Sequence, residues 1–393
     1  MFLSFFLDWE QRKLGDDLIN VQTGTSLLGT ENGKGIPLIK MGNIQHGYFD
    51  LSKLEYLEED IKVENYAIAR YGDFLFNTRN TLELVGKSAT WIVKTGLYAF
   101  NGNIARFIFK DLNTIFFNYL YNTDNVMKQV HARATGTTSV AAIYPKNLNS
   151  IEYYLPSKIE QEKIGELFLK IDNLITLHQR KCDKLVNIKK SLLEKMFPKN
   201  GNNVPEIRFK GFTEAWEQRK LNEISNIYDG THQTPNYQNN GVMFLSVENI
   251  KTLESEKYIS EEDFKNNFRI YPQKNDILMT RIGDIGTTNI VKDNAPKAYY
   301  VSLALIKAYS INPKYLNIAI SSEFVQQGLK TRALLTAIPM KINKDQIGLV
   351  DVKYPIDNKE QEKIGQLFKD IDNLITLHQK KLRSEERRVR ERV

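Results

Sequence analysis

The chain has 393 residues, of which 41% are hydrophobic, a single cysteine, Cys182, and a formal net charge of +7. Its length and hydrophobic content predict two to three packed domains and exclude a disordered chain, while the lone cysteine excludes an internal disulfide framework and indicates a reducing, cytoplasmic location. Residues 380–393 carry seven Lys or Arg and three Glu, so more than half of the net charge lies in this tail, and the remaining body only weakly indicates a polyanionic partner.

Two copies of one short stretch open the two halves of the chain. WEQRKL occurs at Trp9–Leu14 and again, 207 residues later, at Trp216–Leu221. Residues 1–8 are apolar but lack the features of a signal peptide, and no run in the chain approaches the roughly 18 apolar residues of a membrane span. We therefore expect no membrane segment. We expect instead that the start site of this sequence is placed too early or in the wrong frame.

Short apolar runs rich in Tyr, Phe, Ile and Val follow each copy, separated by Gly and Asn. They predict short strands with turns about every eight to twelve residues, and so a mixed sheet with a few helices in each half. The predicted strands lie within 74–80, 88–96, 103–110, 242–250, 276–283 and 299–310, and the predicted helices within 116–134 and 326–335.

A long helix is predicted from the stretch EQEKIGELFLKIDNLITLHQRK, which begins at Glu160. Ser157 and Glu160 fit a capping box at its start, and Pro198 ends it. Residues recur at heptad spacing, with a second set three positions after the first, which is typical of a coiled coil. The expected pairing residues are Ile164, Leu167, Ile171, Leu174, His178, Leu185, Ile188 and Leu192, and the stripe is widened by Phe168, Ile175 and Cys182.

A second copy, EQEKIGQLFKDIDNLITLHQKK, begins at Glu360, 200 residues after the first. Like helices favour self-complementary two-fold pairing, which makes them antiparallel, although the pattern leaves a parallel pairing open. Residues 383–389, RSEERRV, break the apolar pattern, so we expect the natural chain to continue differently after about Lys381. The expected pairing residues of this copy are Ile364, Leu367, Ile371, Leu374 and His378.

The predicted architecture is an α+β protein with an internal pseudo-two-fold repeat. Two globular mixed α/β domains are separated by two long helices. The Gly, Asn, Pro and charged residues of KNGNNVPEIR predict a linker between the halves. The resulting boundaries are a first domain at 1–156, a first helix at 157–198, the linker at 199–208, a second domain at 209–356 and a second helix at 357–393.

Catalytic motifs are not evident in the sequence. The glycines around Gly33-Lys34 and Gly86-Lys87 have the wrong spacing for a phosphate-binding loop and are better read as turns. The five histidines lack metal-ligand spacing with one another or with Cys182. Asp351-Val352-Lys353 has the D-x-K form found in nucleases, but such tripeptides are common, and a strand with solvated charges is the better interpretation.

Recognition residues are predicted in loops that place flexible polar side chains beside Gly and Arg. Arg can bind guanine through two hydrogen bonds, Asn and Gln can bind adenine, and Ser, Thr and Lys suit phosphates. The same loops are also ordinary turns. The candidate DNA-binding residues are Asn77, Arg79, Asn80, Arg133, Thr135, Thr137, Thr138, Thr231, His232, Gln233, Thr234, Arg281 and Arg332.

Layout and residues together resemble the DNA-specificity subunits of type I restriction–modification systems. The resemblance covers nearly the whole chain. WEQRKL opens each half, and residues 230–250 and 275–286 are similar to segments of the family's target-recognition domains. The stretch EQEKIG…IDNLITLHQ resembles the helical spacer that separates those domains.

The resemblance implies a non-catalytic subunit with two target-recognition domains, each reading one half of a split, asymmetric double-stranded DNA site. The spacer helices would pair antiparallel and fix the gap. Two modification subunits would supply S-adenosylmethionine for adenine methylation, and restriction subunits would add cleavage driven by ATP and Mg. No cofactor is expected in this chain.

Three other functions stay open from the residues. The chain could serve a different restriction class with a fused nuclease–methyltransferase partner, or act as a stand-alone nuclease through Asp351 and Lys353. A purely structural coiled-coil adaptor is the third, but it leaves the two large unlike domains unexplained.

Overall fold

The computed structural model describes residues 9–390 except 95, 138, 200 and 335, so the expectation about residues 1–8 lies outside it. The chain divides into two compact units, one formed by residues 1–177 with 383–393 and the other by residues 178–382. No helix among the described residues is long and apolar enough to cross a membrane.

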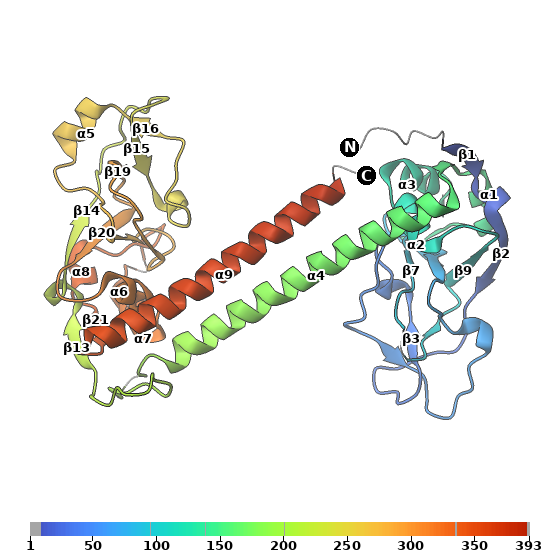
Figure 1. Cartoon of the computed structure of the whole chain (residues 1–393), viewed down its shortest axis with the longest axis horizontal. Coiled ribbons are helices and arrows are strands. Elements are labelled where there is room, and N and C mark those ends of the chain that lie inside the picture. The colour runs from blue at the N-terminus through green and yellow to red at the C-terminus, as the bar shows by residue number, and fades with distance from the viewer. Residues whose placement is uncertain (1–8, 95, 138, 200, 335, 391–393) are drawn as a thin grey trace. The chain divides into compact units, whose positions relative to one another are not determined.

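The first unit is built on an antiparallel four-stranded sheet and a smaller three-stranded sheet (Figure 1). Phe74 and Phe76 are fully buried and pack with Phe107 of the neighbouring strand, which is why the aromatic runs form the centre of the larger sheet. The larger sheet has the order β2 (Leu18–Thr23), β9 (Ile104–Phe109), β5 (Phe74–Asn77) and β7 (Ser88–Thr90). The smaller sheet has the order β4 (Glu55–Tyr56), β3 (Pro37–Ile39) and β8 (Ala99–Phe100).

Three short helices accompany these sheets: α1 (Leu14–Asp17), α2 (Thr114–Tyr121) and α3 (Asp124–His131). The single helix predicted within 116–134 is therefore wrong, since the chain breaks between α2 and α3. Thr123 adopts an extended backbone there, and its hydroxyl donates to the Leu120 carbonyl at 2.8 Å. Thr side chains favour such helix boundaries because they bind nearby backbone groups.

The second unit repeats this arrangement with different residues. Its larger sheet has the order β14 (Ser225–Asp229), β20 (Leu303–Ala308), β17 (Ile277–Thr280) and β18 (Thr288–Ile290). Its smaller sheet has the order β16 (Tyr258–Ile259), β15 (Val242–Leu245) and β19 (Lys297–Tyr299). The helices are α5 (Glu261–Asn267), α6 (Pro313–Ile320), α7 (Glu323–Arg332) and α8 (Lys344–Gly348). The two mixed α/β domains and the internal repeat are thus confirmed.

The two predicted long helices are α4 (Lys158–Lys195) and α9 (Asn358–Arg390) (Figure 1). Within the second unit they are antiparallel, because successive contacts run forward along α4 and backward along α9. Three contacts define this direction: His178 with His378, Cys182 with Ile375, and Lys189 with Asp372. The antiparallel alternative is therefore the correct one. The backbone of α9 also stays helical through residues 383–390, although the apolar pattern has ended.

The covered stripe of each helix differs from the predicted one. Leu167 and Leu174 are each 41% exposed and Ile188 is 39% exposed, so these three do not line the interface. The second set of heptad positions lies four residues after the first, not three. The prediction missed this because two adjacent stripes of α4 are apolar, and heptad spacing alone does not choose between them. The half or fully covered stripes are Ile164, Phe168, Ile171, Ile175, His178, Cys182, Leu185, Lys189 and Leu192 in α4, and Ile364, Phe368, Ile371, Ile375, His378 and Leu382 in α9. Leu367 is also half-buried and packs against the core of the second unit.

A joint attaches the start of α4 to the first unit. The Gln161 side chain accepts from the Asn113 N–H at 3.0 Å and donates to the Pro156 carbonyl at 2.9 Å. Four residues on, Gly165 lies so close to α2 that a Cβ there would be 2.9 Å from the Phe116 nitrogen. Only glycine allows this approach without a shift of the α2 backbone.

The start of α9 is attached to the second unit by an equivalent joint. The Gln361 side chain accepts from the Asn312 N–H at 2.8 Å and donates to the Pro355 carbonyl at 2.8 Å. A Cβ on Gly365 would lie 3.0 Å from the Tyr315 nitrogen at the start of α6. The repeated EQEKIG stretch is therefore the segment that fixes each helix to its own domain.

The repeated WEQRKL stretch completes the same joint. Trp9 packs edge-on against Phe116, with ring centroids 6.2 Å apart, and Trp216 packs edge-on against Tyr315 at 5.9 Å. The following residues form an edge strand that pairs with the strand before each long helix. These antiparallel pairs are β1 (Glu10–Lys13) with β12 (Glu152–Leu155), and β13 (Glu217–Lys220) with β21 (Asp351–Tyr354).

The predicted linker is packed against the second unit. Arg208 binds the fully buried Glu360 carboxylate through two hydrogen bonds of 2.7 and 2.8 Å. The Lys353 amino group donates to the Lys199 and Asn202 carbonyls at 3.1 and 2.6 Å. Charged side chains of the second domain and α9 thus hold this segment in place.

Candidate nucleic-acid interface

Two of the predicted recognition segments meet in a small sheet of the first unit. β6 (Arg79–Asn80) pairs with β11 (Ala141–Ala142), which pairs with β10 (Thr135–Gly136). Arg79, Thr135 and Thr137 are exposed there, and Asn80 is half-buried. The side chains of Arg79, Thr135 and Thr137 can reach a ligand that approaches this sheet. Asn80 lies opposite the core residue Ala141, and its side-chain oxygen accepts from the Thr81 N–H at 2.8 Å. Thr138 lies outside the described residues.

Asn77 and Arg133 bind the protein itself. Asn77 is fully buried at the end of β5, and its side-chain amide donates to the Met41 carbonyl at 2.9 Å. This placement does not favour its predicted DNA contact, because Asn77 continues a strand whose residues are all buried. Arg133 is half-buried, and its guanidinium donates to the Gln129 carbonyl at 2.6 Å and to the Ser150 hydroxyl at 2.9 Å.

Arg281 in the second unit is also a structural residue. Its side chain is 7% exposed, forms an ion pair with Asp229 and donates from Nε to the Ile342 carbonyl at 3.1 Å. Burial lowers the pKa of Arg281. This placement does not favour the predicted DNA contact, because the guanidinium points inward and joins β14 to the segment at Ile342. Arg332, half-buried in the last turn of α7, directs one donor at the Gly328 carbonyl at 3.4 Å.

The loop after β14 carries the remaining candidates of the second unit. His232, Gln233 and Thr234 are exposed, and Thr231 is half-buried. The Thr231 hydroxyl accepts from the Gln233 N–H at 3.2 Å, which holds the turn with its polar side chains toward solvent. This loop therefore remains the better-placed candidate recognition segment of its unit.

An open cavity of about 560 Å³ lies beside this loop. Its lining includes aromatic rings, the loop and two cations that the sequence did not single out, Arg269 and Lys344. Both are exposed, and no ion pair of either is found among the described residues. The cavity is lined by Tyr228, Asp229, Gly230, Thr231, His232, Gln233, Asn266, Asn267, Phe268, Arg269, Ile270, Tyr299 and Lys344. No local motif marks four of the lining residues, because the fold brings them to the cavity from distant parts of the sequence. These four are Asn266, Asn267, Arg269 and Lys344.

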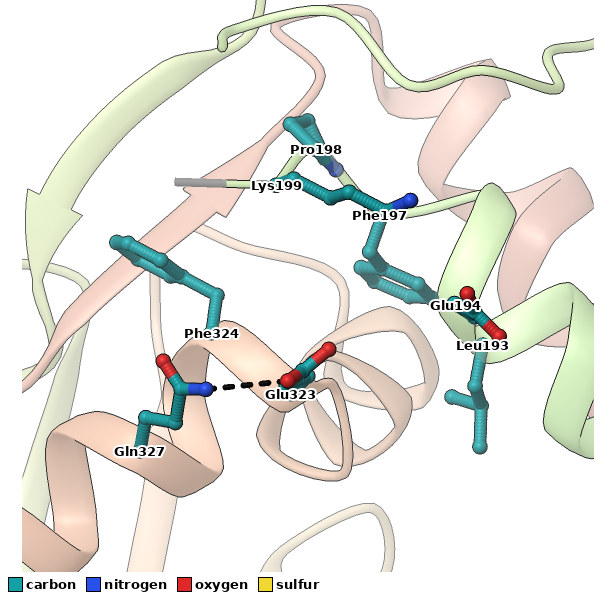
Figure 2. Close-up of a pocket in the computed structure, with 8 residues that line it drawn as sticks. All are labelled: Leu193, Glu194, Phe197, Pro198, Lys199, Glu323, Phe324 and Gln327. Carbon is teal, nitrogen blue, oxygen red and sulfur yellow. Dashed lines mark hydrogen bonds between the residues drawn. The ribbon is translucent and has the colours of Figure 1, made fainter. Parts of the chain in front are cut away.

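A second cavity, of about 220 Å³, lies where the end of α4 packs on α7 (Figure 2). Phe197 and Phe324 form apolar walls, and the Gln327 side chain donates to Glu323 at 3.1 Å. None of the predicted DNA-binding residues lines it. This cavity belongs to the packing of the helix on its domain.

The nuclease interpretation of Asp351 and Lys353 does not fit their surroundings. Lys353 is 5% exposed, its amino group holds the linker carbonyls, and burial lowers its pKa. Asp351 lies 3.8 Å from the Lys220 amino group across the β13–β21 pair. Among the described residues no group of three or more His, Cys, Asp or Glu could hold a metal ion.

Comparison with known families decides between the remaining interpretations. The family model of the type I restriction modification DNA specificity domain matches residues 7–187 and 213–385, which is most of the chain and covers both units. The chain belongs to this family. The specificity subunits that the family comprises recognise DNA and are not themselves catalytic, so the predicted family, function class and non-catalytic character are confirmed.

Two relatives of this specificity chain come from Methanocaldococcus jannaschii. A protein named as the MjaX specificity subunit of a type I restriction enzyme is 26% identical over 95% of this chain and 89% of its own length. The MjaVIII specificity subunit is 24% identical over 95% of this chain and 88% of its own. The crystal structure of a type I S subunit from M. genitalium has a TM-score of 0.67 at 14% identity, covers 100% of this chain and 96% of its own, and shows the same fold.

Proposed function

We propose that this specificity chain recognises a split, asymmetric double-stranded DNA sequence, with each unit reading one half. One observation carries the proposal: the joint residues are repeated, while the candidate contact surfaces are not. The first unit presents Arg79, Thr135 and Thr137, and the second presents His232 and Gln233 beside a polar cavity. Like scaffolds with unlike surfaces suit a site with two different halves.

The proposed protein partners are two modification subunits, joined by restriction subunits. Apolar side chains on the outer stripes of α4 and α9 support a docking role, because exposed apolar stripes of this kind mark protein interfaces. Leu174 and Leu177 in α4 are 41% and 44% exposed, and the equivalent Leu374 and Leu377 are both 45% exposed. S-adenosylmethionine, ATP and Mg would bind to the partner subunits, and the complex would act on DNA in the cytoplasm.

Mapping of methylated adenines tests this function. The modification subunit is expressed in a host with and without the chain, and methylated positions are determined across the genome. A new split motif should appear only with the chain. A matched variant, Leu174→Asp with Leu374→Asp, should abolish the motif by loss of docking. Leu28→Asp serves as a control, because Leu28 is an 86% exposed leucine outside the helices.

Two outcomes would contradict the proposal. If the complex assembles but no new motif appears, the chain does not direct methylation. If the chain instead binds a single fused nuclease–methyltransferase, the partner assignment is wrong, and the chain serves another restriction class.

A further inference from the structure

A three-stranded hairpin element occurs at the same place in both units. In the first unit it is the β6–β11–β10 sheet. In the second unit, isolated bridges give the same order, with Ile282 opposite Lys341 and Lys341 opposite Leu334. The backbone bonds agree, since Ile143 donates to the Thr78 carbonyl at 2.9 Å in one unit and Ile342 donates to the Arg281 carbonyl at 3.0 Å in the other.

This match defines equivalent positions. Directly opposed residues of an antiparallel pair place their side chains on one face, with Cβ atoms roughly 4.5–5.5 Å apart. In the first unit one row across the sheet is Arg79, Ala142 and Thr135. In the second unit the equivalent row is Ile282, Lys341 and Leu334.

Both rows face solvent. The residue before each middle position, Ala141 in one unit and Met340 in the other, packs against its domain core. Because side chains alternate along a strand, the next residue points outward. Arg79 and Lys341 are accordingly exposed.

Each row therefore carries one exposed cation, but the cation lies on a different strand of the sheet in each unit. The first unit has Arg79 on the edge strand opposite Ala142, and the second has Lys341 on the middle strand opposite Ile282. Among the described residues, no ion pair or side-chain hydrogen bond involves either cation. The acid nearest to Lys341 along the chain, Asp345 in the first turn of α8, forms no ion pair with it among the described residues.

We propose that Lys341 and Arg79 are equivalent phosphate contacts, which seat the hairpin of each unit on the DNA backbone. The proposal rests on the proposed function. If the two units read different bases, a feature kept in both must contact what every DNA sequence shares, and that is the phosphate backbone. A cation that is kept on the same outward face, although its residue type and its strand differ between the units, fits a charge contact better than base readout, for which Arg and Lys are not interchangeable.

Salt dependence of DNA binding tests the proposal directly. The full chain, co-purified with its modification subunits, is titrated with a short duplex of random sequence over a series of NaCl concentrations. Loss of one phosphate contact should lower the slope of log K against log salt by about 0.9 in magnitude. Lys341→Ala and Arg79→Ala should each show this loss, and the double variant about twice as much.

A relocated charge gives the sharper test. Lys341→Ala combined with Ile282→Arg places an arginine on the edge strand opposite an alanine, as in the first unit, and should restore the slope. The matched control combines Lys341→Ala with Asn373→Arg on the exposed face of α9, which restores net charge but not the position. A further control, Lys359→Ala in the first turn of α9, removes one exposed charge elsewhere.

The outcomes separate this proposal from the proposed function. If the unaltered complex does not bind duplex DNA, both fail. If the complex binds DNA but Lys341→Ala and Lys359→Ala have the same salt slope, only the phosphate contact is overturned. The same holds if Asn373→Arg restores the slope as well as Ile282→Arg does. If Lys341→Ala leaves the slope unchanged and relaxes one base of the methylated motif, Lys341 reads a base.

Discussion

Replacement of Arg281 by alanine should destabilise the second unit instead of altering base preference. Arg281 joins two candidate recognition segments, because it pairs with Asp229 at the end of β14 and donates to the Ile342 carbonyl beside the hairpin. Truncation would leave a carboxylate without its partner and a carbonyl without its donor. The sequence alone placed this residue on the DNA.

The expected magnitude follows from the burial of the pair. Removal of one partner from a fully buried ion pair costs roughly 3–5 kcal/mol. The Asp229 side chain is 30% exposed, against 7% for Arg281, so water partly compensates the freed carboxylate. We expect about 3 kcal/mol, which corresponds to a fall of roughly 6–12 °C in the unfolding midpoint of a unit of this size.

Thermal unfolding combined with hydrogen exchange measures the effect. Hydrogen exchange localises the loss, and amides of β14 and β17 should exchange faster while the first unit is unchanged. Arg79→Ala is the matched control and should change stability by less than about 0.5 kcal/mol, as exposed sites do. A double-mutant cycle of Arg281→Met with Asp229→Asn should return a favourable coupling energy.

One result would refute this reasoning. If Arg281→Ala unfolds at the same midpoint with unchanged exchange, yet shifts the methylated motif in one half, the guanidinium reads DNA and the ion pair is not its main role.

Three further predictions concern the helices. Ile371→Ala should lower stability by about 3 kcal/mol, whereas Leu374→Ala should cost the isolated chain under about 1 kcal/mol, measured by urea unfolding, and weaken modification-subunit pulldown. Gly365→Ala should lower the thermal midpoint despite its better helix propensity, because the new Cβ would lie 2.8 Å from the Lys314 Cβ. Burial, followed by nearby positive charge, lowers the pKa of His378 below 6.5. Unfolded chains then take up the proton first, so stability should fall as pH drops through about 6.5, and less steeply in His378→Leu.

The sequence predicted the long helices because their pattern spans many turns, and it favoured antiparallel pairing because the two copies are alike. It missed the covered stripe for a local reason. Leu174 and Ile175 are adjacent and equally apolar, so periodicity alone does not tell which of the two faces the partner. The structure covers Ile175 and leaves Leu174 exposed.

The candidate site was harder to predict because the sequence of a Gly- and Thr-rich segment suggests an exposed loop even where its side chains are buried. Asn77 and Arg281 both follow a buried strand closely, and tertiary partners hold them inside. The Arg281–Asp229 pair joins residues 52 positions apart, which no local pattern reveals. Lys341 has no motif at all, and only the equivalence of the two hairpins identifies it.

The repeated joint has a consequence for how such a chain can change. The contacts that fix a long helix to its domain in both units lie in WEQRKL, EQEKIG and the start of the helix they meet. Gln161 and Gln361 bind equivalent groups, and Gly165 and Gly365 leave equivalent gaps. The domain between these segments is therefore exchangeable, and a domain moved from one position to the other would meet the same contact residues on its new helix.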